Sequence, residues 1–247
     1  MIKTFEINKS EVSSDYRFDA AFYHFSKMIK EDSLNKGVAY TKLKTLCSTI
    51  SDGEHSAIPR QKEFGVRYLY GRNIKDGIVN FDPNTDSSYI TEENYQKFSR
   101  IHLKENDILL TIVGTIGKTA VYKQEYIGKA GIPRHIAKIR LKEDCSVSPE
   151  YIVAFFLSKL GKWQLYNITT GNIQPLLSIG NIEKLDIPII QKDLHNEVTG
   201  KERKFVESES KALKLISQAQ QLFYSRIGID FKNIVKENIF SVNKNDF

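Results

Sequence analysis

The segment from Leu194 to Ile227 constrains the fold more than any other part of the chain. It contains no proline and only one glycine, and its apolar residues recur at the seven-residue spacing of a coiled coil. At about 1.5 Å per residue, a helix of about 34 residues extends roughly 50 Å. Such a helix projects from a small domain unless another helix lies along it. The seam is more apolar in its second half, and the helix-packing positions that we predict are Val198, Phe205, Ala212, Leu215, Ala219 and Leu222.

Between residues 40 and 190 the pattern changes to short β-like runs separated by turn residues. In Asp107–Tyr122, two apolar runs flank a turn at Gly114–Gly117, which predicts a strand, a turn and a strand. Two helices interrupt this region. Thr91 is placed to cap the first, and Ser148-Pro149 begins the second, which we expect Gly161 to close. The predicted fold class is α+β: a mixed α/β domain with an irregular β-sheet, followed by a long coiled-coil-type helix.

Four parts follow from these patterns. Residues 1–39 carry apolar side chains at helical spacing, which predicts an N-terminal helical arm. The mixed domain is predicted at residues 40–190. A long spacer or dimerisation helix follows at residues 191–228, and a tail at residues 229–247. In the tail, Phe240–Phe247 (FSVNKNDF) repeats the pattern of Phe5–Val12 (FEINKSEV). This echo favours a second repeat that begins in the tail. The alternative is a half-sized subunit that dimerises.

Composition permits a nucleic-acid partner without requiring one. The net charge is +6 and the pI is near 9.1, a mild basic excess. Cys47 and Cys145 lack the spacing of a metal or redox motif, which favours a reducing compartment. The N-terminus does not read as a signal peptide, and no apolar run approaches the length of a membrane span. We therefore expect a cytoplasmic protein with no membrane partner.

The motifs do not favour catalysis. Gly114–Thr119 (GTIGKT) resembles a phosphate-binding loop, but two residues separate its glycines where that motif requires four, so a hairpin turn is favoured. The Asn/Asp-Pro-Pro-aromatic motif of an adenine methyltransferase does not occur, and the histidines lack metal-ligand spacing. We expect no catalytic residue, no metal site and no cofactor bound by this chain.

Polar and basic residues in loops are the remaining candidates for function. Arginine can bind guanine bidentately and Asn or Gln can bind adenine, whereas lysine more often contacts phosphates. His135 fits a DNA contact and a structural histidine equally well, and any one of these residues alone could be an ordinary surface residue. The candidate DNA-binding residues are Arg60, Arg72, Asn73, Arg134, Asn172 and Gln174 for base edges, Lys62, Lys75, Thr115 and Lys118 for phosphates, and His135.

A family resemblance accompanies these candidates. Asp107–Tyr122, Ile132–Leu141 (IPRHIAKIRL), Pro149–Leu160 and Thr169–Ile190, in this order, resemble the target-recognition domain of type I restriction-modification specificity subunits. The resemblance covers roughly residues 40–227. It implies a non-catalytic subunit that recognises one half-site of double-stranded DNA for a restriction-modification or methyltransferase complex, with the long helix as a ruler between two recognition domains.

The resemblance also implies partners. These are DNA methyltransferase subunits that bring S-adenosylmethionine, in some complexes a restriction subunit that uses ATP and Mg, and a second recognition domain in the same chain or in a homodimer partner. Two alternatives stay open: a recognition module of a type II restriction-methyltransferase, and a coiled-coil interaction protein without a DNA role. The bases recognised do not follow from the sequence, because no code links one loop residue to one base.

Overall fold

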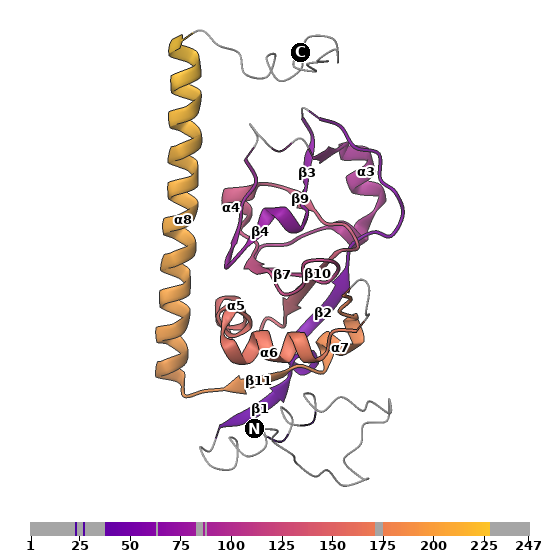
Figure 1. The fold of residues 1–247 in the computed structure, drawn as a ribbon, viewed down its shortest axis with the longest axis vertical. Helices are drawn as coiled ribbons and strands as arrows, with labels where there is room; N and C mark the ends of the chain where they lie inside the picture. The colour runs from indigo at the N-terminus through magenta and orange to yellow at the C-terminus, as the bar shows by residue number, and fades with distance from the viewer. Residues whose placement is uncertain are drawn as a thin grey trace, which may run out of the picture.

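The computed structural model describes residues 23, 27, 38–62, 64–82, 86, 88–170 and 175–227. They form a small α+β domain with a long helix beside it (Figure 1), which confirms the predicted fold class. The predicted tail at 229–247, and most of the predicted arm at 1–39, lie outside the described residues.

A four-stranded antiparallel sheet forms the centre of the domain. Ile108 pairs with Val121, so the predicted strand-turn-strand of Asp107–Tyr122 is confirmed. Alternate residues of a strand face opposite sides of a sheet. Accordingly, Ile108 and Leu110 pack into one hydrophobic cluster and Leu109 into another. In spatial order the strands are β2 (Cys47–Asp52), β10 (Ile136–Leu141), β7 (Ile108–Thr111) and β8 (Thr119–Val121).

A smaller sheet and a hairpin cover one face of the central sheet, and helices cover the other. The smaller sheet has the order β6 (Tyr89–Ile90), β3 (Val66–Tyr68) and β9 (Ala130–Gly131), and the hairpin joins β4 (Ile74–Lys75) to β5 (Ile78–Val79). Short helical segments connect these strands: η2 (Gly71–Asn73), α3 (Glu92–Lys97), η3 (Ser99–Ile101) and α4 (Gln124–Ile127). The helices on the opposite face are α2 (Leu43–Leu46), α5 (Pro149–Leu157), α6 (Lys159–Asn167) and α7 (Ile179–Glu183).

The two ends of the domain meet. Strand β1 (Ala39–Lys42) pairs antiparallel with β11 (Asp186–Ile189), so that Ala39 lies opposite Ile189. Helix α8 (Lys192–Ile227) begins directly after this pairing (Figure 1). The long helix therefore leaves the domain from its base and runs back along it.

Helix starts follow the predicted caps, but one helix end does not. The Thr91 hydroxyl accepts a hydrogen bond from the Asn94 N–H, and the Ser148 hydroxyl accepts one from the Tyr151 N–H. The expectation that Gly161 closes the second helix is wrong. Ser158 ends α5 and caps α6, so Gly161 lies inside α6. There a Cβ would lie 2.0 Å from the Phe155 carbonyl oxygen, so the glycine permits a close helix-to-helix approach.

Helix α8 has one face packed against the domain and another face that is exposed. Thr199 and Val206 are buried against the domain, and Val198 packs partly against the main core. The predicted seam lies on a different face: apart from Val198, all its members are exposed in the structure, with Leu215 at 64% and Leu222 at 60%. Ile216 and Phe223 extend this exposed apolar stripe. Phe205 packs against Gly77 of the β4–β5 hairpin, so the heptad pattern predicts, in its second half, a contact that the described part of the domain does not make.

A polar cluster joins α8 to the domain. Glu150 of α5 is buried, and its Oε1 lies 3.1 Å from the Lys123 Nζ and 3.5 Å from the Arg203 Nε of α8. Burial alone would raise the pKa of Glu150, but its own backbone N–H, Lys123 and Arg203 together lower it. Burial and the neighbouring Glu150 carboxylate raise the pKa of Glu202 on α8. Within the described structure, Glu150 Oε2 and Glu202 Oε1 are buried without a hydrogen-bond partner.

The raised pKa of Glu202 predicts pH-dependent stability. The folded-state pKa exceeds the ordinary value of 4.5, so the buried charge lowers stability as the pH rises through the folded pKa, and has no effect below the unfolded pKa. Glu202→Gln is therefore expected to raise the free energy of unfolding at pH 8 and to change it little near pH 4. Thermal unfolding at the two pH values measures this.

Glu197→Gln is the matched control, because Glu197 is exposed on the same helix and forms an ion pair with Lys201. It is expected to change stability little at pH 8. An equal gain from Glu202→Gln at both pH values would show that the charge is not responsible.

Candidate nucleic-acid interface

Two arginines gather around the ring of Tyr70, at the end of β3. The guanidinium Cζ of Arg60 and that of Arg72 each lie 4.9 Å from the ring centroid, within the range of a cation–π contact. Tyr70 also packs edge-on against Tyr68, with ring centroids 5.6 Å apart. Burial raises the pKa of Tyr70 although both arginines oppose the shift, so the phenol is neutral.

The two arginines differ in how they are held. Arg72 donates from Nη2 to Asp86 Oδ1 at 2.8 Å and to Ser88 Oγ at 2.7 Å, so its guanidinium is anchored. Arg60 is exposed, and among the described residues no acceptor binds its guanidinium. Most of the donor capacity of Arg60 therefore stays available to a ligand.

The prediction that Asn73 contacts a base is wrong in this structure. Asn73 is 1% exposed, and its amide is used internally. Its Oδ1 accepts from the Tyr70 N–H at 2.8 Å, and its Nδ2 donates to the Asn80 carbonyl and to Asp86. Asn73 therefore fixes the turn that carries Arg72, and sequence spacing could not distinguish this role from an exposed one.

Arg134 and His135 lie on the same surface as Arg60. Both residues are exposed, between β9 and β10. Burial of its ring, then the charges of Arg134 and Arg60, lower the pKa of His135. The neutral imidazole carries one donor and one acceptor. The structure thus brings Arg60 close to Arg134 and His135, which lie 74 and 75 positions later in the sequence.

The loop between β7 and β8 continues this surface. Gly114 and Gly117 have φ values of +75° and +89°, a conformation that favours glycine. The Gly114 N–H donates to the Pro175 carbonyl at 3.3 Å, and Thr115 at the tip is exposed. The Thr111 N–H donates to the Lys118 carbonyl at 2.9 Å, and the Lys118 N–H donates to the Thr111 Oγ1 at 3.0 Å. Because Thr119 then begins a strand rather than a helix, GTIGKT is a hairpin turn, as predicted.

The remaining candidates are dispersed. Lys62 is exposed in the loop after Arg60. Lys75 is exposed on the β4–β5 hairpin, whose Gly77 packs against Phe205 of α8, so Lys75 lies toward the long helix. Asn172 and Gln174 lie outside the described residues.

A buried ion pair and a buried lysine lie at the central sheet, and neither was predicted. Asp107, with no exposed surface, accepts from Arg140 Nε at 2.7 Å and Nη2 at 2.6 Å. Lys138 is buried, and its Nζ donates to the carbonyl oxygens of Arg100 and His102 at 2.7 and 2.9 Å. Arg100 in turn pairs with Asp52. The signal in the sequence was the pair of charges inside the apolar strand IAKIRL.

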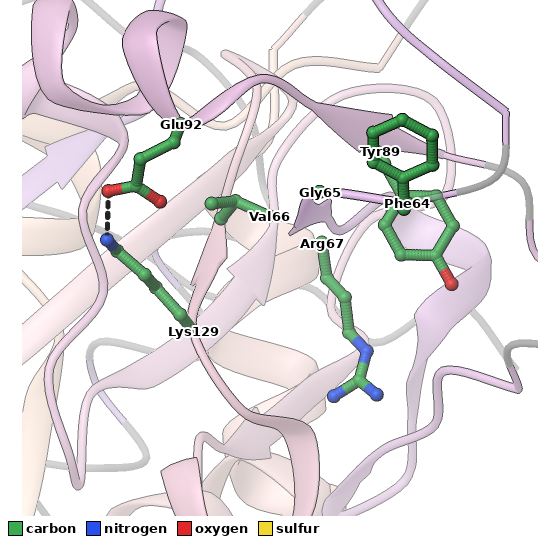
Figure 2. Close-up of a pocket in the computed structure, with 7 residues that line it drawn as sticks. All are labelled: Phe64, Gly65, Val66, Arg67, Tyr89, Glu92 and Lys129. Carbon is green, nitrogen blue, oxygen red and sulfur yellow. Dashed lines mark hydrogen bonds and ion pairs between the residues drawn. The ribbon is translucent and has the colours of Figure 1, made fainter.

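A separate hollow of about 460 Å³ opens beside the smaller sheet (Figure 2). Lys129 and Glu92 form an ion pair on one side, and Arg67 and the exposed Phe64 lie on the other. The Arg67 guanidinium lies 5.3 Å from the Phe81 ring centroid, so it forms a cation–π contact of its own. None of the predicted DNA-binding residues lines this hollow.

No cluster of three His, Cys, Asp or Glu side chains that could hold a metal ion occurs among the described residues. None of the helices in the described ranges is long and apolar enough to cross a membrane.

The small α+β domain carries an arginine-lined surface built from loops, and it continues into a long helix. This arrangement defines a recognition module with a spacer. The family model of the type I restriction modification DNA specificity domain matches residues 59–193. This range is more than half of the 247 residues, and the chain belongs to this family.

Three solved structures are similar to the chain, each at 13% identity. The S subunit of a type I restriction-modification system from M. genitalium has a TM-score of 0.46, over 68% of this chain and 39% of that one. A structure described in terms of complex assembly and conformational transition of the type I R-M system has a TM-score of 0.48, over 84% and 50%. The HsdS subunit from Thermoanaerobacter tengcongensis has a TM-score of 0.46, over 80% and 46%. The chain therefore spans half or less of each structure's length. No curated protein matches it.

Proposed function

We propose that this chain recognises one half-site of a double-stranded DNA sequence, as a specificity subunit of a type I restriction-modification or DNA methyltransferase complex. The family membership supports this proposal. The observation that carries it is the convergence of Arg60, Arg134 and His135 on one exposed surface beside the β7–β8 loop. Cationic and hydrogen-bonding side chains on adjoining loops suit both phosphates and base edges.

Different residues have different roles in this proposal. Arg60 and Arg134 are exposed and suited to base edges, whereas Arg72 is held by Asp86 and contributes charge and shape. Lys62, Lys118 and Thr115 are placed to contact phosphates. The chain carries out no chemistry and binds no cofactor: methyltransferase subunits supply S-adenosylmethionine, and a restriction subunit, where present, supplies the steps that need ATP and Mg. The complex acts in the cytoplasm.

The exposed stripe of α8 completes the proposal. Leu215, Ile216, Leu222 and Phe223 are each at least 56% exposed, a large apolar surface for a soluble domain. The long helix of a second recognition domain, in the same chain or in a homodimer partner, would cover this stripe. The two domains would then be held at a fixed distance and read two half-sites.

A salt titration tests the DNA contact. If about six phosphates are neutralised, the logarithm of the association constant is expected to fall with the logarithm of salt concentration at a slope near −5. Fluorescence anisotropy with a labelled duplex measures the slope for the complex of this chain with its methyltransferase subunits, and for those subunits alone. A slope that is the same with and without this chain would contradict the proposal.

A further inference from the structure

We propose that Arg60 reads a guanine in the half-site, and that Tyr70 positions Arg60 for this contact; the proposal rests on the DNA-recognition function above. Five guanidinium donors in a planar fork match the O6 and N7 acceptors that guanine presents in the major groove. Among the arginines around Tyr70, Arg60 is exposed and, within the described part of the chain, bound by no acceptor.

Arg72 is excluded from this role by its own contacts. Its Nε and Nη2 both donate to Asp86 Oδ1, at 3.0 and 2.8 Å, and Nη2 also donates to Ser88. Reading a base would require it to leave these acceptors, and the Asp86 carboxylate, whose side chain is only 12% exposed, would lose its partner at a cost. Asp86 is further held by the Nδ2 of the buried Asn73. The anchored Arg72 therefore supports one side of Tyr70 while Arg60 stays available.

Tyr70 is the residue that fixes the direction of Arg60. A guanidinium that stacks on an aromatic ring keeps its donors directed along the ring plane and outward, where a base edge can meet them. Preorganisation of this kind reduces the side-chain entropy lost on binding. The ring is itself held by the edge contact with Tyr68. In the described structure the Tyr70 hydroxyl is buried and has no partner, so the ring, not the hydroxyl, carries the function.

The experiment selects duplexes from a randomised pool with the complete complex of this chain and its methyltransferase subunits. Wild type is expected to enrich a half-site that contains a specific guanine. In Arg60→Ala the preference for guanine at that position is expected to disappear, while the preferences at the other positions stay unchanged. The variant is also expected to bind the wild-type sequence about tenfold or more weakly. Tyr70→Leu is expected to weaken the same position, and Tyr70→Phe to preserve it. Arg67→Ala is the matched control, because its guanidinium also lies over an aromatic ring but in the hollow away from this surface.

A chemical probe makes the assignment to guanine specific. Replacing that guanine with 7-deazaguanine, which lacks the N7 acceptor, is expected to weaken wild-type binding several-fold and to leave the Arg60→Ala variant unaffected. Equal weakening of both proteins would overturn the proposal, as would an Arg60→Ala effect that is uniform across all sequences, which would make Arg60 a phosphate contact. Both outcomes leave DNA recognition standing, whereas failure of wild type to enrich any sequence would overturn recognition itself. Preserved affinity of Tyr70→Leu for non-cognate duplex shows that this variant is folded.

Discussion

Replacing Asp107 with alanine is expected to lower the free energy of unfolding by about 3–5 kcal/mol. The Asp107 carboxylate has no exposed surface and is bound by two donors of Arg140 and by the Lys104 N–H. Its loss leaves the Arg140 guanidinium without its partner, close to the buried Lys138 ammonium. A typical domain is stable by only about 5–15 kcal/mol, so this single change removes a large part of the total.

Urea unfolding measures this effect as a shift of the midpoint at constant slope. Lys44→Ala is the control, because Lys44 and Glu183 also form an ion pair, at 3.0 Å, but its lysine is 68% exposed. Exposed pairs contribute about 0–1 kcal/mol. If Asp107→Ala costs no more than Lys44→Ala, the buried ion pair does not hold the sheet together.

Introducing Asp at Leu215 and Leu222 together is expected to weaken helix-to-helix association of this chain by at least about 100-fold. Each leucine lies on the exposed stripe of α8, and burying one leucine contributes about 1.5–3 kcal/mol. Two buried charges in a helix seam add a further cost. Sedimentation equilibrium of the chain, as a function of concentration, measures the association.

Lys214→Asp with Gln221→Asp is the matched control. These residues have the same seven-residue spacing one position earlier, and both are exposed and polar; their replacement changes the net charge by −3, against −2 for the two leucines, so the control does not understate the effect of charge. The control pair lies off the apolar stripe and is expected to leave association within a few-fold of wild type. Equal effects of the two double variants would show that charge alone acts, and that the stripe is not the contact.

Much of the fold was predictable where local rules dominate. The Asp107–Tyr122 hairpin followed from apolar runs flanking glycines, and the caps at Thr91 and Ser148 followed from residue type and position. The long helix followed from its composition. The break at Ser158 was not predicted, because it depends on α6 packing closely against the end of α5 through Gly161.

The site was less predictable than the fold. Arg60, Arg134 and His135 converge because β9 and β10 bring distant loops together, and no local pattern encodes that pairing. Asn73 looked like a surface residue in a Tyr-Gly-Arg-Asn turn, and only its hydrogen bonds show that it is structural. The role of Tyr70 depends on contacts with two arginines, one ten residues before it and one two residues after it.

Methylome sequencing of a host that carries this chain with the proposed methyltransferase partner tests the central claim most directly. The comparison is the same host without this chain. We expect a DNA motif of two separated half-sites that is methylated only when the chain is present, with one half-site altered by Arg60→Ala. An identical methylome with and without the chain would contradict the claim that it directs sequence recognition.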